Sequence, residues 1–97
     1  MDRVDNRLAD YTEAIRLDPK LVKAYYLRGR EYESKGEKAK AEKDFDTAIA
    51  NCTEAIRINP KCADAYLWRG IAYTAKGEKA KAKTDLDEAM KLRSKPP

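Results

Sequence analysis

The sequence predicts an all-α protein assembled from repeated helix pairs, and three observations indicate this. Shifting the chain by 41 residues aligns 20–49 with 61–90, and 16 of those 30 positions are identical. Apolar and aromatic side chains recur at the three- and four-residue spacing of an amphipathic helix. Proline and glycine punctuate both copies at matching positions. We therefore predict five helices, at about 3–17, 20–35, 37–58, 61–76 and 78–93.

The beginnings and ends of the helices are set by local signals. Asp18 and Asn59, each followed by a proline, are expected to cap the helices that start there, with the proline at the first helical position. Gly36 and Gly77 are expected to end the same helices in the left-handed conformation that glycine tolerates. The stretch 12–20, TEAIRLDPK, matches 53–61, TEAIRINPK, at seven of nine positions. The first predicted helix is therefore the tail of a further copy.

Small and aromatic residues indicate how the helices pack. Gly29 and Gly70 lie inside helices, where glycine costs about 1 kcal/mol relative to alanine, so we expect a neighbouring helix to approach closely at each. Four tyrosines fit the core between helices: Tyr25, Tyr32, Tyr66 and Tyr73. Trp68 fits either packing or a partner contact. The plentiful aspartates Asp44, Asp46, Asp85 and Asp87 are expected on polar helix faces.

These residues resemble the signature of the tetratricopeptide repeat family. The matching sets are Tyr25, Gly29, Tyr32, Ala41, Phe45 and Ala48, and then Tyr66, Gly70, Tyr73, Ala82, Leu86 and Ala89. Pro19 and Pro60 match the proline that closes each repeat of the family, whereas Arg28 and Arg69 stand where the family commonly has leucine. The resemblance implies a single domain, 1–97, folded as a right-handed solenoid of helical hairpins. Its parts would be a half repeat (1–19), an extended repeat (20–60) and a second repeat (61–95).

The repeat length departs from the family. The period here is 41 residues and the family's is 34, and the seven extra residues fall in the predicted helix 37–58. Seven residues turn a helix by about 700°, only ~20° short of two turns, so the apolar face of Ala41, Phe45, Ala48, Cys52 and Ala55 is preserved. We expect a helix of about 33 Å, with two additional apolar turns to be covered.

Function is predicted to be protein binding without catalysis. In the resembled family a concave groove binds peptides, and alignment places eight residues in it: Lys23, Tyr26, Arg30, Glu33, Asp64, Leu67, Ile71 and Thr74. The first four offer cationic and aromatic surface and the others more apolar surface, which suits a ligand with an acid near one end and aliphatic groups near the other. The partner is expected to be a protein or peptide.

The alternative function is self-association, as a homodimer, a swapped dimer or a larger assembly. The first helix lacks its own partner helix, and solenoids with fewer than three repeats are marginal alone. The residues expected to pair with another copy are Leu8, Tyr11, Ile15, Ile49, Cys52 and Ile56.

Composition argues against other classes of function. The chain has no histidine and two cysteines, so it lacks the usual zinc spacings, and we expect no metal and no cofactor. Both cysteines are expected to be reduced thiols. The net charge of +4 comes from lysines mixed with acids, which favours solvated helix faces over nucleic-acid binding. Without a signal peptide or a long apolar run, we expect a cytoplasmic protein that does not bind membranes.

Overall fold

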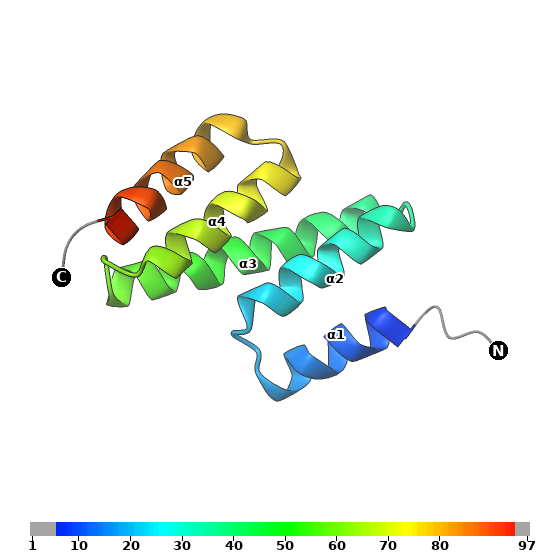
Figure 1. Ribbon diagram of the computed structural model, residues 1–97. Coiled ribbons are helices and arrows are strands. Elements are labelled where there is room, and N and C mark those ends of the chain that lie inside the picture. Colours follow the sequence, from blue (N-terminus) through cyan, green and yellow to red (C-terminus); the bar gives the residue numbers. More distant parts are fainter. Residues whose placement is uncertain (1–5, 95–97) are drawn as a thin grey trace.

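The computed structural model describes residues 6–94, and they form five helices. These are α1 (Asn6–Leu17), α2 (Val22–Ser34), α3 (Lys38–Ile58), α4 (Ala63–Lys76) and α5 (Lys79–Ser94). Each helix packs against the next one along the chain, and α2 also touches α4. Figure 1 shows α3 in the middle of the stack, with α1 and α5 at opposite ends. The all-α prediction of five helices with a long middle helix is confirmed.

The predicted helix caps at Asp18 and Asn59 are wrong, because these residues hold turns that precede the helices. The Asp18 Oδ1 atom accepts a hydrogen bond from the Lys20 amide at 3.2 Å, and the Leu21 amide donates to the Asp18 carbonyl at 3.0 Å. Asn59 makes the same pair of contacts in the second copy. An Asp or Asn side chain readily bonds the backbone two residues on. The helices therefore start later, after Leu21 and Cys62, whose side chains make no capping bond.

The predicted left-handed glycines are confirmed. Gly36 has a φ of 80° and Gly77 a φ of 84°. In each case the amide after the glycine donates to the carbonyl of a tyrosine five residues earlier, Glu37 to Tyr32 and Glu78 to Tyr73, both at 2.9 Å. This pairing satisfies carbonyls that the end of a helix leaves free, and it turns the chain sharply into the second helix of each pair.

The core is made mostly of small residues, so the helices approach closely. Its buried apolar members are Ala24, Ala41, Phe45, Ala48, Cys52, Ala65, Ala72, Ala82 and Ala89. A Cβ atom on Gly29 would lie 2.6 Å from Cε1 of the Phe45 ring, and one on Gly70 would lie 2.9 Å from Cδ2 of Leu86. Both glycines are thus required for close packing, as their positions predicted.

The long helix α3 serves two neighbours along its length. Its 21 residues span about 31 Å. The N-terminal half carries Phe45, which packs under α2 at Gly29. The C-terminal half carries Thr53, which contacts Arg69 of α4. The two additional apolar turns predicted from the sequence are therefore covered by α4 within the chain.

Across residues 6–94, none of the helices combines the length and the apolar character that a membrane span needs.

Candidate functional site

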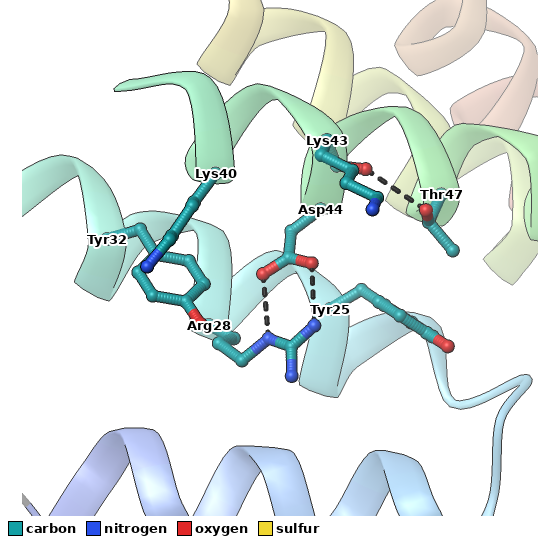
Figure 2. Close-up of a pocket in the computed structure, with 7 residues that line it drawn as sticks. All are labelled: Tyr25, Arg28, Tyr32, Lys40, Lys43, Asp44 and Thr47. Carbon is teal, nitrogen blue, oxygen red and sulfur yellow. Dashed lines mark hydrogen bonds and ion pairs between the residues drawn. The ribbon is translucent and has the colours of Figure 1, made fainter. Parts of the chain in front are cut away.

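A charged pair joins α2 to α3 in the first helix pair. The Arg28 guanidinium donates from Nε to Oδ2 of Asp44 at 2.8 Å and from Nη2 to Oδ1 at 2.9 Å (Figure 2). The Asp44 side chain is 5% exposed and that of Arg28 is 18% exposed. The hydrogen bonds that Arg28 donates to Asp44 raise the pKa of Arg28, so the arginine stays charged at any working pH.

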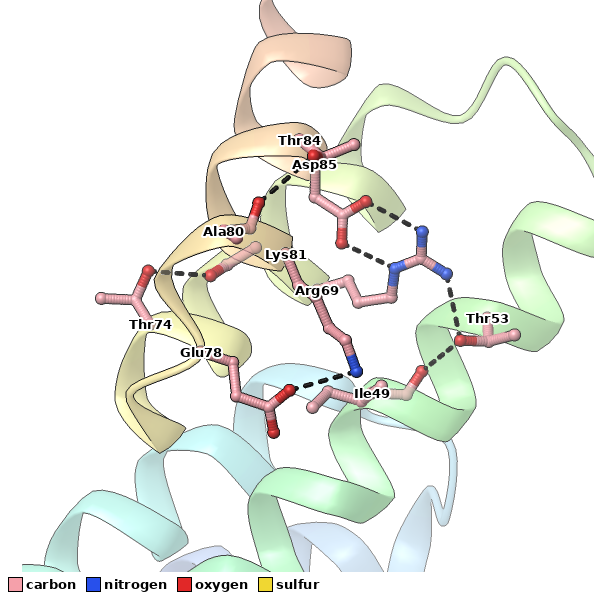
Figure 3. Close-up of polar contacts among 10 residues, drawn as sticks. Ile49, Thr53, Arg69, Thr74, Glu78, Ala80, Lys81, Thr84 and Asp85 are labelled. Atoms are coloured by element: carbon pink, nitrogen blue, oxygen red, sulfur yellow. Dashed lines mark hydrogen bonds and ion pairs between the residues drawn. The ribbon is translucent and has the colours of Figure 1, made fainter.

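The second helix pair repeats this arrangement almost atom for atom. Arg69 donates to Asp85 at 2.7 and 2.8 Å and to the Thr53 hydroxyl at 3.1 Å (Figure 3). In the first pair, Arg28 makes the equivalent bond to Thr12 at 3.2 Å. Asp44 and Asp85 are buried, so their predicted place on polar faces is wrong. Each carboxylate is committed to an arginine, and we interpret both pairs as structural.

The signature tyrosines lie beside these arginines rather than deep in the core. The Tyr25 and Tyr32 rings are 6.0 and 5.7 Å from the Arg28 guanidinium carbon, and the Tyr66 ring is 5.7 Å from that of Arg69. All four tyrosines are half-buried. Their expected role in the inter-helix core is therefore corrected: they flank the ion pairs at the edge of the helix interface, with Tyr73 lying beside Lys81.

A largely apolar cavity of about 330 Å³ opens where α2, α3 and α4 meet, and we call it the apolar pocket. Its apolar lining consists of Leu21, Val22, Cys52, Ala55, Cys62, Ala65 and Trp68. Lys20 and Lys23 stand on the α2 side of its rim and Asp64 on the α4 side. Because Asp64 also forms a 2.8 Å ion pair with Arg93, the rim is left with an excess of positive charge.

The two cysteines share this pocket but differ in exposure. Cys52 is 1% exposed, and burial raises the pKa of its thiol to about 11. Cys62 is half-buried, and neither cysteine forms a disulfide. The prediction of two free thiols is confirmed in the structure.

A second cavity, of about 230 Å³, lies between the C-terminal ends of α2 and α4. Phe45 and Ala41 of α3 line it together with polar and charged groups, among them Glu33, Glu42 and Lys76. We call it the polar pocket. Between the two pockets the Tyr26 ring contacts Trp68 edge-on, at 5.7 Å between ring centroids, and also lies 6.0 Å from Phe45.

Most of the predicted groove residues fall along this line of cavities. Lys23 and Asp64 line the apolar pocket, Glu33 and Thr74 line the polar pocket, and Tyr26 lies between them. Arg30 is exposed and donates to the Tyr26 hydroxyl at 2.8 Å. Leu67 and Ile71 are half-buried on α4 and line neither pocket. Sequence reasoning did not identify Val22, Ala55 or Cys62 as part of the surface, since each belongs to a helix end or to the back helix.

The residues predicted for self-association lie partly inside the chain. Leu8, Tyr11 and Ile15 are half-buried on α1, and Ile49 and Ile56 are half-buried on α3. Cys52 is enclosed within the chain's own core, so in this conformation it offers no surface to another copy.

Comparison with known proteins agrees with the helix-pair architecture. A family model described as tetratricopeptide repeat matches residues 39–95, and a second model with the same description matches residues 22–50. The first alone spans more than half of the chain. The chain belongs to the tetratricopeptide repeat family. Members of this family are generally protein-interaction modules and typically non-catalytic scaffolds.

Solved structures and curated sequences were also compared with the chain. A solved structure titled "Crystal structure of MamA" is 28% identical, with a TM-score of 0.47; the match covers 93% of this chain and 50% of that one. The chain thus spans half the length of that structure. A search of curated protein sequences gives no significant match.

Proposed function

We propose that this tetratricopeptide repeat domain binds an extended segment of another protein along α2 and α4, and that the apolar pocket holds one of its apolar side chains. The observation that supports this most is the pocket itself. It lies within the ~300–1,000 Å³ range of ligand cavities, and its lining of valine, alanine, cysteine and tryptophan suits a buried apolar anchor. Anchors of this kind contribute most of the energy at protein interfaces.

The charges on the rim of the apolar pocket favour an acidic residue next to the apolar anchor in the bound segment. Lys20, in the turn before α2, and Lys23 of α2 line the pocket, while Asp64 is already paired with Arg93. An acidic residue beside the apolar one would therefore be attracted to α2. Both lysines are exposed, so we expect them to influence the association rate and partner choice more than the affinity.

Peptide binding can be followed through Trp68, which is the single tryptophan of the chain and lines the pocket. Peptides selected from a random library should change its fluorescence on titration. Val22→Glu places a charge in the pocket and should weaken their binding at least tenfold. Met90→Glu is the matched control, since it changes an apolar residue that is 68% exposed on α5, outside both pockets. Equal binding by wild type and Val22→Glu, with both folded by circular dichroism, would refute the proposal.

Thiol labelling gives a second readout. At pH 8 a maleimide should modify Cys62 and leave Cys52 unmodified, because the raised pKa of Cys52 keeps its buried thiol protonated. Raising the pH towards 11 should increase thiolate formation at Cys52. A bound peptide should slow labelling of Cys62, with Cys52→Ala used to assign the modified residue. Unchanged labelling of Cys62 in the complex would place the ligand elsewhere.

One observation favours self-association as a second function. Met90 on α5 corresponds, 41 residues on, to Ile49 on α3. Ile49 is half-buried, and its carbonyl accepts a hydrogen bond from Thr53 (Figure 3), whereas Met90 is 68% exposed. Another copy could cover this end of the stack with its α1 face of Leu8, Tyr11 and Ile15. Light scattering over a range of concentrations tests this: a mass that rises with concentration in wild type and not in Met90→Glu supports it, and a monomer mass throughout excludes it.

A further inference from the structure

A cleft of about 410 Å³ between α2 and α3 lies away from the groove and is not used by the proposed peptide site. Tyr25, Arg28 and Tyr32 line it from α2, and Lys40, Lys43 and Thr47 from α3 (Figure 2). At about 100° per residue, the α2 positions 25, 28 and 32 lie on nearly the opposite side of the helix from the groove positions 23, 26, 30 and 33. A ligand in this cleft would therefore leave the apolar pocket free.

The cleft combines aromatic walls with cations that are not fully neutralised. Arg28 is balanced by Asp44. The Lys40 ammonium lies 5.5 Å from the centre of the Tyr32 ring and 2.9 Å from Glu37, and it remains exposed. Lys43 is exposed and, within residues 6–94, forms no ion pair; its backbone carbonyl accepts a hydrogen bond from Thr47. Figure 2 shows the Lys40 ammonium beside the Tyr32 ring and the Lys43 ammonium on the Thr47 side of Asp44, so an anion on that side of the cleft meets Lys43.

The second helix pair supplies an internal comparison for this cleft. Five of the lining residues recur as Tyr66, Arg69, Tyr73, Lys81 and Asp85. Two do not, because Thr84 replaces Lys43 and Glu88 replaces Thr47. The formal charge of the lining is therefore +2 in the first pair (three cations and one anion) and zero in the second (two cations and two anions). The framework is shared, and only the charges at its solvent side differ.

We propose that this cleft is a second interaction site, which binds an acidic side chain of a partner protein. The carboxylate would pair with Lys43, and its aliphatic stem would lie against the ring of Tyr25, which is on the same side of the Arg28–Asp44 pair (Figure 2). A glutamate suits this arrangement because its two methylene groups can contact the Tyr25 ring while the charge stays near Lys43. The equivalent residues of the second helix pair, with Glu88 in place of Thr47, would repel the same ligand.

The test exchanges the two differing residues between the cleft and the equivalent positions of the second helix pair. A fluorescein-labelled peptide of alternating glutamate and serine should bind wild type in a salt-dependent manner, and the glutamine-for-glutamate peptide should not. Lys43→Thr with Thr47→Glu, which copies the second cleft into the first, should lower the association constant at least tenfold. Thr84→Lys with Glu88→Thr, which copies the first cleft into the second, should raise the stoichiometry from one peptide to two.

A matched control separates the cleft from the overall positive charge of the chain. Lys79→Glu lowers the net charge by two, as Lys43→Thr with Thr47→Glu does, but Lys79 does not line the cleft. It should reduce binding by less than threefold. Val22→Glu should leave this binding unchanged, so failure here and failure of the groove proposal are distinguishable. The proposal is overturned if Lys79→Glu weakens binding as much as Lys43→Thr with Thr47→Glu does, or if the glutamine peptide binds as well as the glutamate peptide. It is also overturned if a single-stranded oligonucleotide binds more tightly than the acidic peptide and depends on Lys43 in the same way.

Discussion

The two helix pairs are nearly identical inside and different outside. The ion pairs of Arg28 with Asp44 and of Arg69 with Asp85 agree to about 0.1 Å in each hydrogen bond. By contrast, Lys43 and Thr47 become Thr84 and Glu88 on the surface, and Arg30 becomes Ile71. The packing geometry restricts the first set of positions, whereas the second set is free to change. We therefore expect recognition to be specified at positions where the helix pairs differ.

The largest expected effect comes from breaking an ion pair. Asp44→Ala or Asp85→Ala leaves a mostly buried guanidinium without its carboxylate, which should lower the free energy of unfolding by about 3 kcal/mol. The two costs should agree within about 0.5 kcal/mol in urea titrations followed by circular dichroism. Arg28→Leu combined with Asp44→Leu should recover most of the loss, because an apolar pair needs no charge compensation. A cost below 1 kcal/mol in either helix pair would show that the ion pair is not an important contact.

Adding a methyl group at the two close helix contacts should destabilise the first helix pair more than the second. In Gly29→Ala the new Cβ would meet the Phe45 ring, which is 1% exposed and cannot move freely. We expect a net loss of about 1–2 kcal/mol, since the overpacking cost exceeds the gain in helix propensity. In Gly70→Ala the first obstacle is Leu86, a half-buried and more adaptable side chain, although the Ala82 carbonyl is only 3.2 Å away. Thermal unfolding should show the smaller effect for Gly70→Ala, and the reverse order would contradict this account of the packing.

The smallest effect is expected at the left-handed glycines. A Cβ atom at Gly36 or Gly77 would meet nothing within 4 Å, so only the backbone conformation is penalised. Alanine at either position should cost about 1 kcal/mol, equally in the two pairs by chemical denaturation. Unequal costs would mean that the two turns, which share their φ values and hydrogen bonds, differ in the unfolded chain.

Much of the fold could be predicted because its signals are local. Gly36 and Gly77 follow amphipathic segments, and glycine after such a segment has a direct backbone cause. The prediction of helix caps at Asp18 and Asn59 is wrong because the same side chains favour both caps and turns. The two structures differ only in whether the backbone amide that donates to the side chain belongs to a turn or to the first turn of a helix. Helix starts were therefore placed a few residues early.

The ion pairs and the cleft were harder to predict. Asp44 looks like a solvated residue in an isolated helix pattern, and its partner Arg28 lies on a different helix, outside the local spacings that pair charges. A signal was nevertheless present: an arginine is followed 16 residues later by an aspartate in both copies, and a threonine precedes it by 16. The apolar pocket has no such signal, because it arises only where three helices converge.

The sharing of α3 has a consequence for how the domain unfolds. In a solenoid, stability divides into the intrinsic stability of each unit and the coupling between neighbours. Here one helix provides a wall for both α2 and α4, so neither pair can open at this helix without uncovering the core of the other. We expect unfolding to be close to all-or-none across both pairs, with the amide hydrogens of α3 the last to exchange with solvent and those of α1 the first.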